Sequence, residues 1–148
     1  MRSRLSRSFL VIASVCVVAC GARKPPPPDQ LRAWMVGRFS PELVAKVEGG
    51  QIRFEGGDGN SRDAAVVIVG ADGDREGVPA EYLWIAQRHG IQGVDWGPAE
   101  QSVTRPDDKG RRFDVLTIDV ANQLSRKTYY FDVTGFYGKE STWFPVPR

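Results

Sequence analysis

Residues 64–69 have the sequence AAVVIV, six consecutive apolar side chains of which the last four are β-branched. β-Branched side chains favour the extended backbone, and apolar residues on both faces are typical of a strand that is covered on both sides. The Gly- and Asp-rich segments 56–63 and 70–77 bound this run, as loops do. The sequence therefore predicts a central, doubly covered strand at 64–69.

A helix is predicted after this strand, over residues 78–89. Tyr82 and Ile85 fall on one face at helical spacing. Pro79 suits the first turn, where its missing N–H leaves no hydrogen bond unmade. Gly90 is the expected end of the helix, because glycine is enriched just beyond helix C-termini.

The segment before the strand allows two interpretations. Apolar residues recur at helical spacing through residues 29–48, with an interruption at Ser40 and Pro41 where a second helical turn can begin. Gly49 and Gly50 also suit a two-residue turn between two short strands. We favour helix before Gly49 and a strand after it.

The remaining chain predicts an antiparallel meander. Three strand-like segments, residues 99–105, 113–120 and 127–134, are separated by turn-forming sequences. Together with the preceding segments, they predict one α+β domain over residues 29–148. This domain has one or two helices packed on a mostly antiparallel sheet of about four or five strands.

The N-terminal 20 residues differ in composition from the rest of the chain. Three arginines precede the run FLVIASVCVVAC at residues 9–20, which has 11 residues before its final cysteine and no acidic residue. That length fits the apolar region of a signal peptide and falls well short of the ~20 residues needed to span a bilayer. The run ends in Val17, Val18, Ala19 and Cys20.

This N-terminal segment resembles a bacterial lipoprotein signal peptide with its lipobox, although Val17 stands where the family usually has Leu. The resemblance implies that residues 1–19 are removed and that Cys20 receives a diacylglycerol. The alternative is an ordinary secretory signal cleaved close by, which leaves Cys20 as a free thiol. The resemblance also implies a cell-envelope location, facing the periplasm or the cell surface. Gly21 replaces the Asp that often marks inner-membrane retention, which favours the outer membrane over the inner.

Residues 20–28 form the predicted lipidated tether. Their four prolines favour a stiff polyproline II spacer. The membrane, reached through the lipid on Cys20, is therefore the expected partner. Because Cys16 is removed with the signal and Cys20 is lipidated, the mature chain has no cysteine left for a disulfide.

Charge and motifs exclude several classes of function. After Cys20 the chain has 17 basic and 18 acidic residues, a balance that predicts no nucleic-acid partner. Neither glycine-rich segment has a phosphate-binding spacing, so no cofactor is expected. His89 is the only histidine, its place before Gly90 suits a helix end, and no serine lies in a G-x-S-x-G sequence. The chain is therefore not expected to be an enzyme.

Residues 72–77 resemble the first half of a calcium-binding loop. Asp72, Asp74 and Glu76 stand where that pattern places its first ligands. The twelfth position, which supplies the bidentate glutamate, is Leu83. We therefore favour a turn that leads into a helix N-terminus over a metal site.

Aromatic side chains give the remaining candidates for a binding surface. Trp96 and Trp143 lie in Gly- or Pro-flanked segments, and Tyr137 lies in the C-terminal region. Exposed aromatic side chains are typical contacts for an envelope protein or a glycan. The sequence predicts an envelope lipoprotein with a non-enzymatic binding or assembly domain. The alternative is a small calcium-dependent or hydrolytic envelope protein that uses residues 72–76 or His89.

Overall fold

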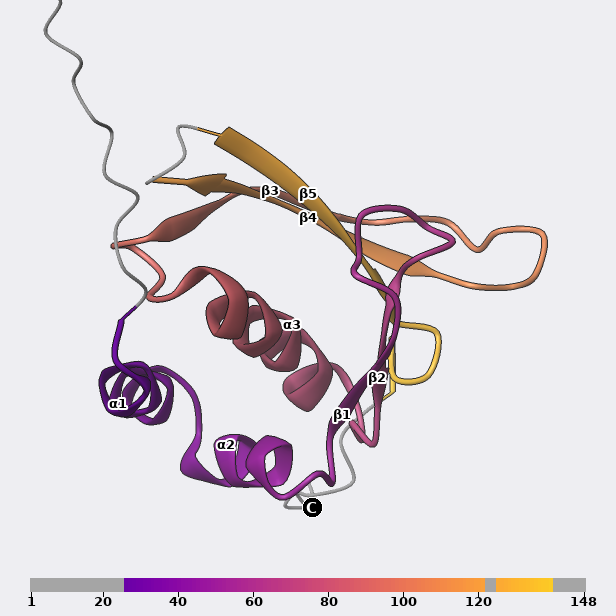
Figure 1. Cartoon of the computed structure of the whole chain (residues 1–148). Helices are drawn as coiled ribbons and strands as arrows, with labels where there is room; N and C mark the ends of the chain where they lie inside the picture. Colours follow the sequence, from indigo (N-terminus) through magenta and orange to yellow (C-terminus); the bar gives the residue numbers. More distant parts are fainter. Residues whose placement is uncertain (1–25, 122–124, 140–148) are drawn as a thin grey trace, which may run out of the picture.

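The computed structural model describes residues 26–121 and 125–139. Three helices lie on one face of a five-stranded mixed sheet (Figure 1), which confirms the predicted α+β class. In chain order, the elements are α1 (Pro28–Arg38), α2 (Pro41–Glu48), β1 (Arg53–Gly56), β2 (Val66–Val69), α3 (Asp74–His89), β3 (Trp96–Val103), β4 (Phe113–Val120) and β5 (Ser125–Asp132). Among the described helices, none has the length and apolar character needed to cross a membrane.

The sheet joins a hairpin to a meander. Its strand order is β1-β2-β5-β4-β3, with antiparallel pairing everywhere except between β2 and β5. These two strands run parallel, with Val66 opposite Phe131 and Val67 opposite Asp132. The mostly antiparallel sheet and the meander of β3, β4 and β5 are therefore confirmed, and the connection through α3 spans the inner face of the sheet (Figure 1).

The helical interpretation of residues 29–48 is confirmed. Two helices occupy this segment, and the second begins at Pro41, whose missing N–H is tolerated there. The Ser40 hydroxyl accepts a hydrogen bond from the Leu43 amide at 3.1 Å, which satisfies one of the free donors of the first turn. β1 follows the Gly49 and Gly50 turn, so no hairpin forms across these glycines.

The prediction that the strand at 64–69 is covered on both faces is wrong, because helices cover only one face. β2 begins at Val66 and lies between β1 and β5. Val66 and Ile68 are buried beneath the helices, whereas Val67 and Val69 are half-buried on the outer face. No described helix packs on that outer face (Figure 1). β-Branched residues on both faces reflect strand propensity here as much as burial.

α3 begins four residues earlier than predicted, at Asp74. Asp74 and Glu76 occupy its first turn, where carboxylates interact favourably with the positive end of the helix dipole. Pro79 therefore lies inside the helix, and its predicted place in the first turn is wrong. The helix ends as predicted before Gly90, whose φ of 94° is in the left-handed region that favours glycine.

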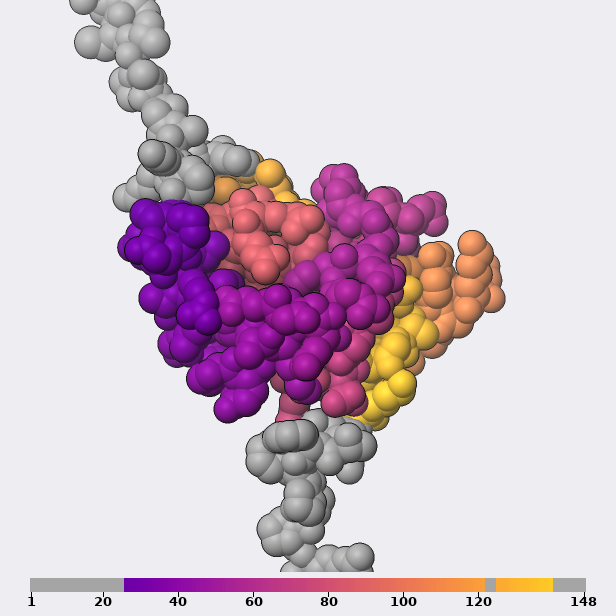
Figure 2. Space-filling model, turned by 60° about the horizontal axis from the view of Figure 1, so that its bottom comes forward, coloured from indigo at the N-terminus to yellow at the C-terminus, as the bar shows by residue number. Residues whose placement is uncertain are grey.

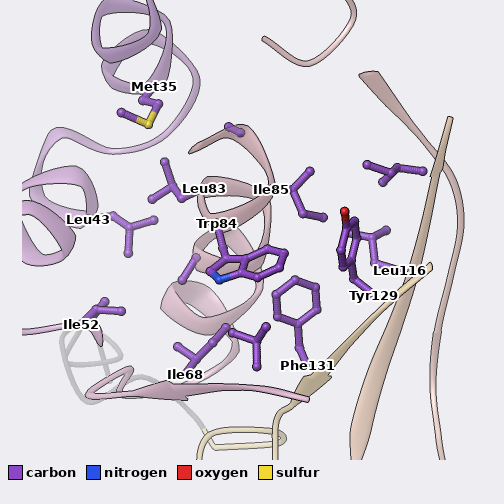
Figure 3. Close-up of a cluster of buried hydrophobic side chains, with 14 of the residues drawn as sticks. Met35, Leu43, Ile52, Ile68, Leu83, Trp84, Ile85, Leu116, Tyr129 and Phe131 are labelled. Atoms are coloured by element: carbon purple, nitrogen blue, oxygen red, sulfur yellow. The ribbon is translucent and has the colours of Figure 1, made fainter. Parts of the chain in front are cut away.

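The core lies between α3 and the inner face of the sheet (Figure 3). Trp84 is at its centre and makes edge-on ring contacts with Tyr129 and Phe131 of β5, at centroid separations of 5.2 and 5.5 Å. Met35 of α1 and Leu43 of α2 approach α3 from the side away from the sheet (Figure 3). α3 is thus covered on both sides, which explains why seven of its residues are buried.

Candidate functional site

A surface hollow lies where the turn after α3 meets one end of the meander. Its volume is about 560 Å³, within the range of small-molecule sites. Val94, Trp96 and Val120 line its apolar part, and Asp119 and Arg126 stand at its edge. The pairing of β3 with β4 brings residues 93–97 beside residues 119–121, and β5 adds Ser125 and Arg126. Because these segments are distant in sequence, no local pattern indicates the hollow.

The wall of the hollow is held by the turn over residues 90–95. The Asp95 carboxylate accepts a hydrogen bond from the Ile91 amide at 2.9 Å, and the Trp96 indole N–H donates to the Gly90 carbonyl at 2.9 Å. A side chain at Gly90 would bring its Cβ into a steric clash with the Asp95 carboxylate. Glycine is therefore required at this position both for its backbone conformation and for this close approach.

The charged side chains at the edge of the hollow form ion pairs with one another. The Arg126 guanidinium donates to Asp119 at 2.9 and 3.4 Å and lies 4.0 Å from Glu100. The hydrogen bond with Arg126 lowers the pKa of Asp119, and the same contact raises the pKa of Arg126. The hollow thus presents apolar surface beside a paired arginine.

The predicted aromatic surface is only partly in place. Trp96 is 2% exposed and begins β3, so its expected place on an exposed aromatic surface is wrong. It is instead one of the residues around the hollow. Tyr137 is 42% exposed, and the Arg112 guanidinium lies 4.6 Å from the centre of its ring. Trp143 lies outside the described residues.

The carboxylates of residues 72–76 serve the start of α3. Glu76 forms an ion pair with Lys46 of α2 and accepts a hydrogen bond from the Asp72 amide at 3.1 Å. Asp74 accepts from the Gly138 amide at 3.1 Å. This arrangement confirms the turn that leads into a helix N-terminus. In the described part of the chain, no three His, Cys, Asp or Glu side chains are grouped to hold a metal ion.

His89 contacts the sheet as well as ending its helix. Its Nε2 lies 2.6 Å from the Tyr129 hydroxyl on β5. Burial lowers the pKa of His89, and the neighbouring charges of Lys127 and Arg88 lower it further. The neutral imidazole therefore links the last turn of α3 to β5.

The structure contains a buried pair of carboxyl groups that was not predicted from the sequence. Glu81 of α3 is 0% exposed and Asp114 of β4 is 2% exposed, and the two side chains face each other across the helix–sheet interface. Asp114 accepts a hydrogen bond from the Gln101 amide group at 2.7 Å, and Gln101 in turn accepts from the Tyr82 hydroxyl at 2.8 Å. This chain of side chains leads from the buried pair to the surface.

The surroundings of the carboxyl pair favour the protonated form of Glu81. Burial, followed by the negative charge of Asp114, raises the pKa of Glu81 to about 10. Burial also raises the pKa of Asp114. Within the described residues, no donor reaches either Glu81 oxygen or Oδ1 of Asp114. A protonated Glu81 can donate to Asp114, which provides a partner for one oxygen of each group, and it avoids the repulsion between two ionised carboxylates in contact.

Comparison with known proteins adds no relative. No protein-family model, no curated protein and no solved structure matches the chain.

Proposed function

We propose that this chain is a lipid-anchored protein of the cell envelope, with the outer membrane favoured over the inner, whose domain is a non-enzymatic binding module. The lipidated residue is Cys20, and the membrane is the first partner. The basic start of the chain, the apolar run of residues 9–20 and the proline-rich tether after it support the anchoring.

The apolar hollow beside Trp96 is the observation that supports a binding role for the domain. It is concave, of ligand size and largely apolar, and its edge charges are paired with each other. A hollow of this kind suits an uncharged apolar group carried by a ligand or partner. This hollow would carry the recognition, without a catalytic side chain.

Labelling with radioactive palmitate tests the anchoring, with two cysteine variants as a matched pair. Cys20→Ala should abolish the label and release the protein from the membrane fraction. Cys16→Ala should keep both, because residue 16 lies in the removed segment. A Cys20→Ala protein that still carries label and sediments with membranes would refute the assignment.

A further inference from the structure

The start of the described chain lies against the wall of the hollow. Pro26 is so close to Gly90 that a Cβ on Gly90 would lie 3.1 Å from the Pro26 ring. Figures 1 and 2 both place the indigo start of the chain beside the salmon segment that follows α3. The entry of the tether and the hollow are therefore at the same end of the domain.

The distance from the anchor to this end is short. Pro26 follows Cys20 by six residues, which span at most about 20 Å when fully extended. The opposite end of α3, where Asp74 binds the Gly138 amide, lies a further helix length of roughly 24 Å away. If Cys20 is lipidated, as the proposed function requires, the end with the hollow is the one held next to the bilayer.

The chemistry of this end suits the apolar part of a lipid. Val94 at the edge of the hollow is 53% exposed, so it adds accessible apolar surface to the lining. Gly93 and Gly97 have open space where a side chain would be, with no atom within 4 Å of an added Cβ. Because Arg126 is already paired with Asp119, the edge favours an uncharged chain over an anionic headgroup.

We propose that the hollow takes up an acyl chain of a bilayer lipid, with the exposed Val94 side chain in contact with that chain and the buried Trp96 in the wall beside it. The inference rests on the proposed anchoring and adds the ligand class and the orientation of the domain. Burial of apolar surface supplies the affinity, at roughly 25 cal/mol for each Å² removed from water. The short tether favours the contact by keeping the hollow and the lipid at high local concentration.

Quenching of tryptophan emission by brominated lipids tests this proposal. The lipidated full-length protein is reconstituted into phosphatidylcholine vesicles with brominated or ordinary acyl chains, and flotation confirms that it is bound. The wild type should lose emission in brominated vesicles, and Trp96→Phe should lose most of that bromine-dependent effect. Since only the bilayer lipids carry bromine, occupation of the hollow by the protein's own anchor would give no quenching and would overturn the proposal.

Two valine variants, one just before β3 and one at its far end, form a matched pair in which the second is the control. Val94→Asp places a charge at the edge of the hollow and should reduce the quenching of Trp96. Val103→Asp, at the far end of β3 and 39% exposed in the wild type, should leave it unchanged. Both variants should float and melt like the wild type. Flotation without any bromine-dependent loss overturns the lipid site alone, whereas failure of the wild type to float overturns the anchoring and this inference with it.

Discussion

Glu76 and Glu81 lie five residues apart on α3, yet their surroundings differ completely. Glu76 is in the first turn, partly exposed, and faces the Lys46 ammonium. Glu81 is fully buried and faces a second carboxyl group on β4. The first is a carboxylate stabilised by a cation and the helix dipole. The second favours its protonated form, because burial and then the neighbouring Asp114 carboxyl group disfavour its ionised form. The same residue type thus has two different charge states on one helix.

The largest expected effect is a pH dependence of stability that comes from Glu81. The folded state raises the pKa of Glu81 from 4.5 to about 10, so it retains a proton that the unfolded chain releases between these values. The contribution of this proton to the free energy of unfolding is therefore fully present below about pH 4.5. It is lost as the pH rises toward about 10, at up to about 1.4 kcal/mol per pH unit. Urea unfolding at several pH values measures this slope.

Replacement of each glutamate by glutamine separates the two sites. Glu81→Gln imitates the protonated acid and should flatten the slope, making the variant more stable than the wild type at pH 8. Glu76→Gln is the matched control and should keep the wild-type slope. Parallel curves for the wild type and Glu81→Gln would show that Glu81 does not hold the proton.

A smaller effect is expected from Asp114→Asn, which removes the neighbouring charge and keeps the shape. The pKa of Glu81 should fall by about one pH unit or more. It should remain above its ordinary value, because burial is the leading cause of the shift. Carboxyl-carbon NMR titration of the glutamates reports this directly, and an unchanged Glu81 midpoint would mean that the two acids do not interact.

Tyr82→Phe should weaken the polar chain that ends at the surface. The variant loses the 2.8 Å hydrogen bond to Gln101, which is expected to cost about 1 kcal/mol of unfolding free energy. Tyr130→Phe, on the outer face of β5, is the comparison variant. Equal stability losses from the two changes would indicate that the Tyr82 hydroxyl has no special role beside the carboxyl pair.

The smallest effect is expected at the Glu76 site. Lys46→Met removes the ion pair with Glu76 and keeps most of the apolar stem, so a loss of about 0.5 kcal/mol is expected. Because salt screens charges near the surface, the difference from the wild type should shrink at high ionic strength. Denaturant melts in low and high salt measure it. A salt-independent loss would point to packing of the lysine stem.

Local patterns predicted the elements better than their arrangement. The alternation of residues 113–120 gave β4 with its bounds, because a strand with one buried face has a period of two. β3 and β5 begin three and two residues before the predicted positions. The start of α3 was missed because Pro79 fits a first turn so well, although Asp74 and Glu76 are equally good first-turn residues. The parallel pairing of β2 with β5 has no local signal.

The site residues were harder to predict. The sequence does contain a signal for one member of the carboxyl pair. Asp114 is two and four residues before Leu116 and Ile118, so in a strand its side chain lies on the same buried face as theirs. Its partner could not be chosen, because register between a helix and a strand is set by packing. The burial of Trp96 follows from its pairing opposite Val120, a contact made by residues 24 positions apart. The residues that form the wall and the edge of the hollow are also distant in sequence, and strand pairing alone brings them together.

The parallel contact between β2 and β5 has a consequence for the chain as it emerges. β5 begins 56 residues after β2 ends, which corresponds to several seconds of synthesis at roughly 5–20 residues per second. During that interval the apolar β2 has a partner on one edge only, and its other edge is a template for pairing with another nascent chain. Val66 opposite Phe131 and Val67 opposite Asp132 then close the sheet. Because the two parts of the sheet join late and through only two residue pairs, the yield of folded protein depends on keeping nascent chains from pairing with one another before β5 is made.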